Sequence, residues 1–232
     1  MNRDDPSTSA DVCVLSSGMT DVTIGEETAV CLVVNPLLWQ TDSEVFDEMF
    51  YSQVLILPNA DDFSRFSVKG SWNSSDVIDE DPILTTFGTE VGMHVESMGK
   101  MSTQRAFRMH GELKTFPINT AIINVDKGEV TEITWDDGCH FCRASQCEQN
   151  AYDYNATLLQ GDLSGSNCFW PDSDCVMQAG VEGQVSSLCQ LTVYVVWTGT
   201  DSKGNYFTSF AKRLSMFAGE VSEGTECLSL ER

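Results

Sequence analysis

The stretch LTVYVVW, residues 191–197, decides the fold class of this 232-residue chain. Successive side chains in a β-strand point to opposite faces. One face would therefore carry the side chains of Leu191, Val193, Val195 and Trp197. Tyr194 and Val196 make the opposite face apolar too, and strands that are apolar on both faces are typically central in their sheet. We predict a central strand here.

A turn signal follows this strand directly. Residues 200–205 read TDSKGN, in which Gly204 and Asn205 tolerate a positive φ. The chain then becomes apolar again at Tyr206 and Phe207. Two apolar runs that flank a short polar turn are typical of a β-hairpin. We therefore predict a hairpin over residues 191–217.

Further strand signals recur along the chain, as short β-branched and apolar runs bounded by turn residues. They cover residues 28–34, 53–57, 63–68, 83–87, 91–95, 106–109, 121–125 and 129–135. The last run alternates, so one of its faces is expected to be exposed to solvent. The best helix candidate is residues 42–50, which have acidic residues in the first turn. The pattern predicts an all-β fold, an antiparallel sandwich or jelly roll with at most one or two short helices.

Cysteines concentrate in one segment of the chain. Residues 1–135 hold two of the nine cysteines, whereas residues 139–189 hold six. We predict a single β-sandwich domain over residues 1–232, with a long Cys-rich excursion at 136–188 pinned by disulfides. Excursions of this length are uncommon in compact domains and often carry function.

Disulfides explain the cysteine-rich segment better than zinc does. The segment is rich in polar and glycine residues, so covalent links would have to offset its ordering entropy. We predict that Cys13 pairs with Cys31 and that six cysteines pair among themselves, namely Cys139, Cys142, Cys147, Cys168, Cys175 and Cys189. Cys227 is left over as an intermolecular or free thiol. The alternative is a zinc site at Cys139-x2-Cys142, which lacks a second close pair.

Two sequons accompany the cysteines. Asn73-Ser74-Ser75 and Asn155-Ala156-Thr157 predict glycosylation at Asn73 and Asn155. Disulfides and glycans together indicate an extracellular, cell-surface or organelle-lumen protein. Residues 1–6 show no apolar signal core. We therefore expect a presequence to have been removed or to be absent from this numbering.

The net charge of −22 restricts the partners. A surface this negative repels nucleic-acid phosphate and anionic lipid, so neither is expected as a partner. No apolar run approaches the ~20 residues of a membrane helix, so no membrane insertion is expected. The same field attracts Ca²⁺, the one candidate cofactor, for which the candidate ligands are Asp76, Asp79 and Asp81. The alternative is a solvated acidic loop.

Four basic residues fall within fifteen positions, at Lys100, Arg105, Arg108 and Lys114. On an acidic protein, such a basic strip could contact an acidic face of a like neighbour. A head-to-tail contact of this kind makes rings or filaments. The alternative is that these charges pair within the chain.

No catalytic motif stands out, and there is no G-x-S-x-G elbow. We therefore predict a non-enzymatic structural or interaction subunit that self-associates or joins a multi-subunit assembly. One alternative is a calcium- or carbohydrate-binding module, with Trp72 or Trp170 exposed to stack on sugars. Another is a metal-dependent enzyme, in which His94 and His110 would meet on one sheet face.

Overall fold

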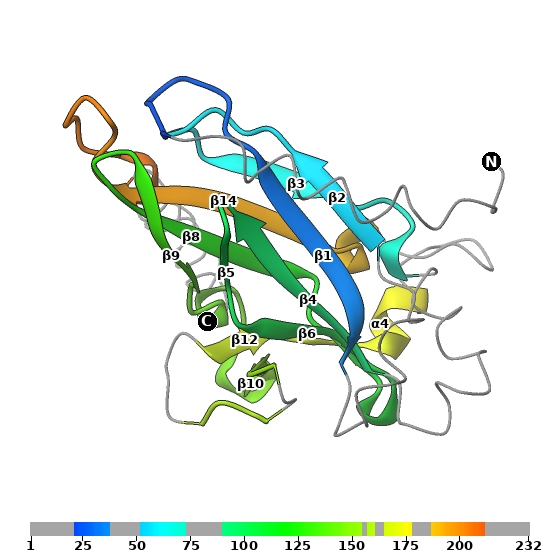
Figure 1. The fold of residues 1–232 in the computed structure, drawn as a ribbon. Helices are drawn as coiled ribbons and strands as arrows, with labels where there is room; N and C mark the ends of the chain where they lie inside the picture. The colour runs from blue at the N-terminus through cyan, green and yellow to red at the C-terminus, as the bar shows by residue number, and fades with distance from the viewer. Residues whose placement is uncertain are drawn as a thin grey trace, which may run out of the picture.

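The computed structural model describes residues 21–37, 52–72, 90–154, 157–160, 165–177 and 187–211. These residues build two β-sheets that face each other across a shared core, with a two-stranded ribbon beside them (Figure 1). The predicted all-β sandwich is confirmed. No helix within these ranges has the length and hydropathy needed to cross a membrane.

The larger sheet has eight strands. Its path is β13-β7-β6-β4-β1-β2, with β11 added to β6 and β5 added to β4. The bounds are β1 Val30–Leu37, β2 Ser52–Ile56, β4 Glu90–Ser97, β5 Lys100–Met101, β6 Gln104–Met109, β7 Lys114–Thr115, β11 Ala151–Tyr152 and β13 Trp170–Pro171. All of its described pairs are antiparallel.

The smaller sheet has four strands in the order β3-β14-β8-β9, and the ribbon pairs β10 with β12. Their bounds are β3 Ser64–Ser67, β8 Ile118–Asp126, β9 Glu129–Trp135, β14 Thr192–Gly199, β10 Cys147–Gln149 and β12 Ser166–Cys168. The named helical segments are α4 Asp172–Met177 and the 3-10 turns η3 His110–Glu112, η4 Cys139–Phe141, η5 Ala144–Gln146 and η7 Ser187–Cys189. The helix predicted at 42–50 and the strand predicted at 83–87 lie outside the described residues.

The core lies between the two sheets. Buried apolar side chains from both of them fill it, among them Leu32, Met93, Phe107, Ile123, Val195 and Trp197. Burying a large apolar side chain of this kind contributes roughly 1.5–3 kcal/mol. Packing between the sheets is therefore the main source of stability, and the disulfides reinforce it.

Strand β14 is central, as its two apolar faces predict, and the hairpin predicted over residues 191–217 appears in the described residues only as a short antiparallel turn at its end. β14 lies between β3, which is antiparallel to it, and β8, which is parallel to it. After the turn, Tyr206 forms an isolated antiparallel bridge with Thr200, and the Phe207 amide donates to the Gly199 carbonyl at 3.1 Å. Residues 212–217 lie outside the described residues. Parallel neighbours require a long crossover connection. Here β9 and the Cys-rich excursion supply that connection between β8 and β14.

A β-bulge sets the faces of β9. Val125 pairs with Val130 and Asn124 with Glu132, so Thr131 is the extra residue. Strict alternation would place Val130 and Ile133 on opposite faces, but the bulge shifts the phase by one residue. Val130, Ile133 and Trp135 are consequently all buried, while Glu129, Thr131 and Glu132 are exposed. The exposed face predicted for residues 129–135 is confirmed.

Candidate functional site: the stapled excursion and its pocket

The excursion begins where β9 ends. The Asp136 amide donates to the Thr120 carbonyl at 3.0 Å and extends the β8–β9 ladder. Gly138 follows, and its backbone amide donates a hydrogen bond to the Ser166 carbonyl at 3.1 Å. A Cβ on Gly138 would lie 1.8 Å from Oδ1 of Asn167, so this approach requires a glycine. The excursion therefore starts at Asp136-Asp137-Gly138, where the backbone at Gly138 passes close to Asn167 of β12.

Three disulfides cross-link the excursion. They join Cys139 to Cys147, Cys142 to Cys168, and Cys175 to Cys189. The six cysteines thus pair among themselves, as predicted. Cys139 and Cys142 belong to different disulfides, which overturns the zinc-ribbon alternative. Cys31 is also disulfide-bonded, and its predicted pairing with Cys13 involves a residue outside the described ranges.

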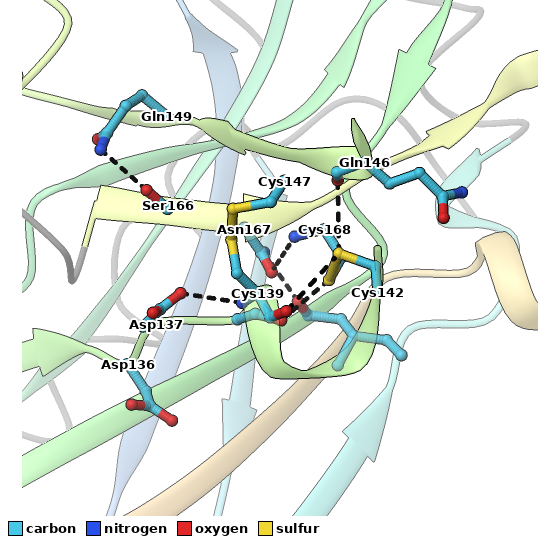
Figure 2. Close-up of a disulfide and its surroundings, with 12 residues drawn as sticks. Asp136, Asp137, Cys139, Cys142, Gln146, Cys147, Gln149, Ser166, Asn167 and Cys168 are labelled. Carbon is cyan, nitrogen blue, oxygen red and sulfur yellow. Dashed lines mark hydrogen bonds between the residues drawn. A yellow bond between two sulfur atoms is a disulfide. The ribbon is translucent and has the colours of Figure 1, made fainter. Parts of the chain in front are cut away.

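Two of these disulfides hold η4 against the β10–β12 ribbon (Figure 2). Cys147 and Cys168 face each other in the ribbon register, yet each is bonded to a different cysteine at an end of η4. Oδ1 of Asp137 accepts the Cys139 amide at 2.9 Å (Figure 2). The ribbon and the 3-10 turn therefore form one covalently closed unit.

The predicted disulfide-pinned excursion also contains short strands of its own. Its strand β11 pairs with β6, and its strand β13 pairs with β7, so it extends the larger sheet. Asn167 ties it to the smaller sheet, since its side-chain amide donates to the carbonyl of Ile118 and to Oδ1 of Asn119, both at 2.8 Å. The excursion is therefore fastened to both layers of the sandwich.

Arg105 and Arg108 are buried inside the chain, which corrects the predicted basic interface strip. Arg105 is 0% exposed, and its Nη2 donates to the Asp136 carbonyl at 2.8 Å. Its guanidinium carbon lies 5.3 Å from the ring centroid of Trp135. Arg105 thus contacts the start of the excursion from β6.

Arg108 forms a buried ion pair with Asp172, the first residue of α4. Its Nε and Nη2 donate to Oδ2 of Asp172 at 3.2 and 3.1 Å. The guanidinium lies 3.8 Å from the ring centroid of Trp72. Thr115 Oγ1 accepts from the Trp72 indole at 3.2 Å and donates to Asp172 at 2.7 Å. A buried charge needs such partners, so pairing within the chain is what places this arginine.

The two lysines of the predicted strip, unlike the two arginines, are not buried. Nζ of Lys114 bonds Glu112 and Glu148, each at 2.6 Å. Burial lowers the pKa of Lys114, but these two carboxylates outweigh it and leave the pKa raised above its usual value. Lys100 is exposed.

The tryptophans proposed for sugar stacking are not equivalent. Trp72 is 8% exposed and lies beneath Arg108, so it offers no open ring face. This corrects the prediction for Trp72. Trp170 is partly buried and packs against the cluster that contains the Cys175–Cys189 disulfide. Neither ring projects freely into solvent.

His94 and His110 lie on different elements. Nε2 of His94 lies 2.8 Å from Oε1 of Glu96, on β4. His110 begins η3, after the end of β6. Within the described residues, no group of three His, Cys, Asp or Glu side chains could hold a metal ion. The structure therefore does not assemble the metal site of the enzyme alternative from these residues.

A pocket of about 200 Å³ lies at the seam where the excursion meets both sheets. We call it the seam pocket. The described residues that line it come from β9, from β5 and its connection to β6, and from the excursion: Met101, Thr103, Glu132, Ile133, Thr134, Trp135, Ala151, Leu159 and Gly165. The Trp135 indole N–H donates to the Thr103 carbonyl at 2.8 Å and closes the seam. A Cβ on Gly165 would lie 2.5 Å from Oε1 of Gln149.

Sequence reasoning located only part of this site. It identified Trp135 as the last residue before the excursion, but it did not connect Trp135 with Met101 or Leu159. Those residues are far apart in the chain and meet only after the sheets have paired. The only local signal in the sequence was the alternation of polar and apolar residues at 129–135, which predicts the strand β9 but not the pocket.

Several predicted site residues lie outside the described residues. They are Cys13, Cys227, the sequon residues Asn73 and Asn155, and the calcium candidates Asp76, Asp79 and Asp81. For these residues, the sequence-based predictions remain predictions.

The chain was compared with known protein families, curated proteins and solved structures. A family model described as Uncharacterised protein DDB_G0273449 matches residues 53–219. This range contains both sheets from β2 to β14 and the whole excursion. No curated protein and no solved structure matches the chain.

Proposed function

Because the chain belongs to the family of Uncharacterised protein DDB_G0273449, whose description names no activity, we propose its function from the geometry. The chain is a non-enzymatic interaction domain, a subunit of an extracellular, cell-surface or lumenal assembly. The observation that carries this proposal is the stapled excursion, which three disulfides and two added strands fasten to the sandwich.

The disulfides support the proposed location in an oxidising compartment. Such bonds form and persist in oxidising environments and are rare where thiols are kept reduced. The pairings here close loops of 8, 26 and 14 residues, all within one segment. A segment stabilised in this way suits a protein that works outside the cytosol.

The many attachments of the described part of the excursion support a role in binding. Binding costs less free energy when the surface is already ordered, because fewer side chains and loops lose freedom on association. Buried Arg105 and Asn167 fix the excursion against both sheets. It therefore presents a preorganised surface, and the seam pocket lies on it.

The test uses protein recovered from its native source. Intact mass under non-reducing and reducing conditions counts the disulfides, with a gain of about two mass units per bond. Sedimentation then measures the size of the native species in a non-denaturing extract and of the purified chain alone. We expect at least three disulfides and a native species larger than the isolated chain. Free thiols at the six excursion cysteines would refute the compartment, and a monomer in the extract would refute the assembly role.

A further inference from the structure

Four cysteines gather where η4 meets the β10–β12 ribbon (Figure 2). Cys139 begins η4, and Cys142 directly follows it. Cys147 and Cys168 face each other in the ribbon. Each disulfide joins one cysteine of the turn to one cysteine of the ribbon, so both bonds cross between the two elements. Four cysteines allow three pairings, and one alternative keeps each bond inside a single element.

The turn brings its own two cysteines within bonding range of each other. Cys139 and Cys142 are three residues apart, and a 3-10 turn separates Cα atoms at this spacing by about 6 Å. Disulfides span roughly 4.4–6.8 Å between Cα atoms. Sγ of Cys142 also lies 4.0 Å from the carbonyl oxygen of Cys139, so its side chain is directed back over the turn. A bond within the turn is therefore compatible with its backbone.

The ribbon register favours a bond between Cys147 and Cys168. In the next pair along the ribbon, the Phe169 amide donates to the Gln146 carbonyl at 2.9 Å. Hydrogen-bonded and non-hydrogen-bonded pairs alternate along an antiparallel ladder, so Cys147 and Cys168 form a non-hydrogen-bonded pair. Cα atoms of such a pair are about 4.5 Å apart and their side chains are close. This separation also lies within the disulfide range.

The two disulfides lie close enough to exchange. Sγ of Cys168 is 3.0 Å from the carbonyl oxygen of Gly138, the residue before Cys139. Together with the Cys142 contact to Cys139, this places both sulfurs of one bond beside the backbone that carries the other. Cys139 and Cys147 are partly exposed, whereas Cys168 is 1% exposed. The Cys139–Cys147 bond is therefore the one that a thiol from solvent can attack.

We propose that this unit is a disulfide switch, in which a low-molecular-weight thiol of the glutathione class converts the crossed pairing into Cys139–Cys142 and Cys147–Cys168. The thiolate attacks Sγ of Cys147, and Cys139 leaves as a thiolate. Cys139 then attacks Sγ of Cys142, which releases the Cys168 thiolate. Cys168 attacks Sγ of Cys147 and releases the original thiol. Two disulfides are present before and after, so the exchange consumes no oxidant and no reductant.

The exchange changes how the excursion begins. In the crossed state, both ends of η4 are bonded covalently to the ribbon. In the swapped state these bonds are gone, and non-covalent contacts remain, such as the 3.1 Å hydrogen bond from the Gly138 amide to the Ser166 carbonyl. The switch therefore loosens η4 from the ribbon. It goes beyond the proposed function, because neither the compartment nor the assembly role depends on it.

The test incubates the oxidised full-length chain, under native conditions, with reduced and oxidised glutathione. Acid stops the exchange, N-ethylmaleimide blocks free thiols, and mass spectrometry of peptides assigns the bonds. We expect the two within-element bonds to appear together while the Cys175–Cys189 bond stays intact. The initial rate should rise about ten-fold from pH 6 to pH 7, because the thiolate attacks and a thiol of pKa about 8.5 gains thiolate in that proportion.

A double variant tests the ribbon pair by itself. Cys139→Ala with Cys142→Ala leaves only Cys147 and Cys168 in the unit, and these should form a disulfide in the folded chain. Cys139→Ala with Cys147→Ala is the matched control, because it also removes two cysteines but retains the Cys142–Cys168 bond of the structure. Both variants should oxidise to the same extent in the glutathione buffer, and amide spectra verify that each is folded.

Three results would overturn the proposal. Glutathione would leave the crossed pairing of the native chain unchanged, the third pairing, Cys139–Cys168 with Cys142–Cys147, would form in equal amount, or the Cys175–Cys189 bond would exchange at the same rate. The last result would mean that exchange follows unfolding. Crossed and swapped chains have the same mass, so the disulfide count that tests the compartment is unaffected, and the proposed function fails or stands separately.

Discussion

Glu90, the first residue of β4, is an acidic residue that lies partly buried and close to another carboxylate. Its carboxylate faces the η3 turn near Gly111. Burial first, and then the charge of Glu112, raise the pKa of Glu90 to about 7. The same acidic group acts on Tyr152, where burial followed by Glu90, Glu112 and Glu148 raises the pKa to about 12. Carboxylates this close repel one another, so protonation relieves them.

The raised pKa of Glu90 makes stability depend on pH. Between about pH 4.5 and pH 7, folded Glu90 keeps a proton that the unfolded chain has lost. The free energy of unfolding therefore falls as the pH rises through this window. In Glu90→Gln no proton is lost, so its unfolding free energy should exceed that of the parent by about 1 kcal/mol more at pH 8 than at pH 4, after allowance for solvent screening.

Urea unfolding at both pH values measures this difference. Glu129→Gln, at an exposed site, is the matched control and should show no such change with pH. A Glu90→Gln effect that is the same at pH 4 and pH 8 would show that the carboxyl is not perturbed in the folded chain.

Strand β14 depends on a glycine at its end. Gly199 has φ +94° and pairs with Val125 across the parallel β8–β14 ladder. A Cβ at Gly199 would lie 1.8 Å from the Val125 carbonyl oxygen, which accepts the Thr200 amide at 3.0 Å. Backbone cannot move aside without breaking the ladder. The parallel pairing of this element therefore requires glycine at position 199.

We expect Gly199→Ala to lower the free energy of unfolding by about 3 kcal/mol or more, through this clash and the positive φ. Gly204→Ala is the matched control, because Gly204 has φ +82° but no atom lies within 4 Å of its Cβ position. It should lose only about 1 kcal/mol. Denaturant unfolding of both variants measures the two losses, and equal losses would show that the close approach to Val125 contributes nothing.

At the scale of the whole fold, the connection between β9 and β14 contributes strands to the larger sheet of the sandwich. The chain leaves the smaller sheet at Trp135, adds β11 and β13 to the larger sheet, and returns to the smaller sheet as β14. Three disulfides close loops along this path. Because a cross-link restricts the unfolded chain more when its loop is longer, the three should differ in their effect on stability.

Removal of the Cys142–Cys168 bond, which spans 26 residues, should cost about 3.5 kcal/mol in the loop-closure model. Removal of Cys139–Cys147, which spans 8 residues, should cost about 2.5 kcal/mol. Paired Cys→Ala variants, unfolded in denaturant without reductant, measure both values. The reverse order would show that native packing around η4, rather than loop length, governs the contribution of each disulfide.

The sequence by itself determined the all-β class, the positions of most described strands and the pairing of six cysteines within one segment. These features depend on local alternation and on cysteine density, which a linear chain displays directly. The parallel neighbour of β14, the burial of Arg105 and Arg108, and the walls of the seam pocket were decided only by the tertiary structure. Each depends on residues far apart in sequence, whose contacts exist only after the two sheets have packed together.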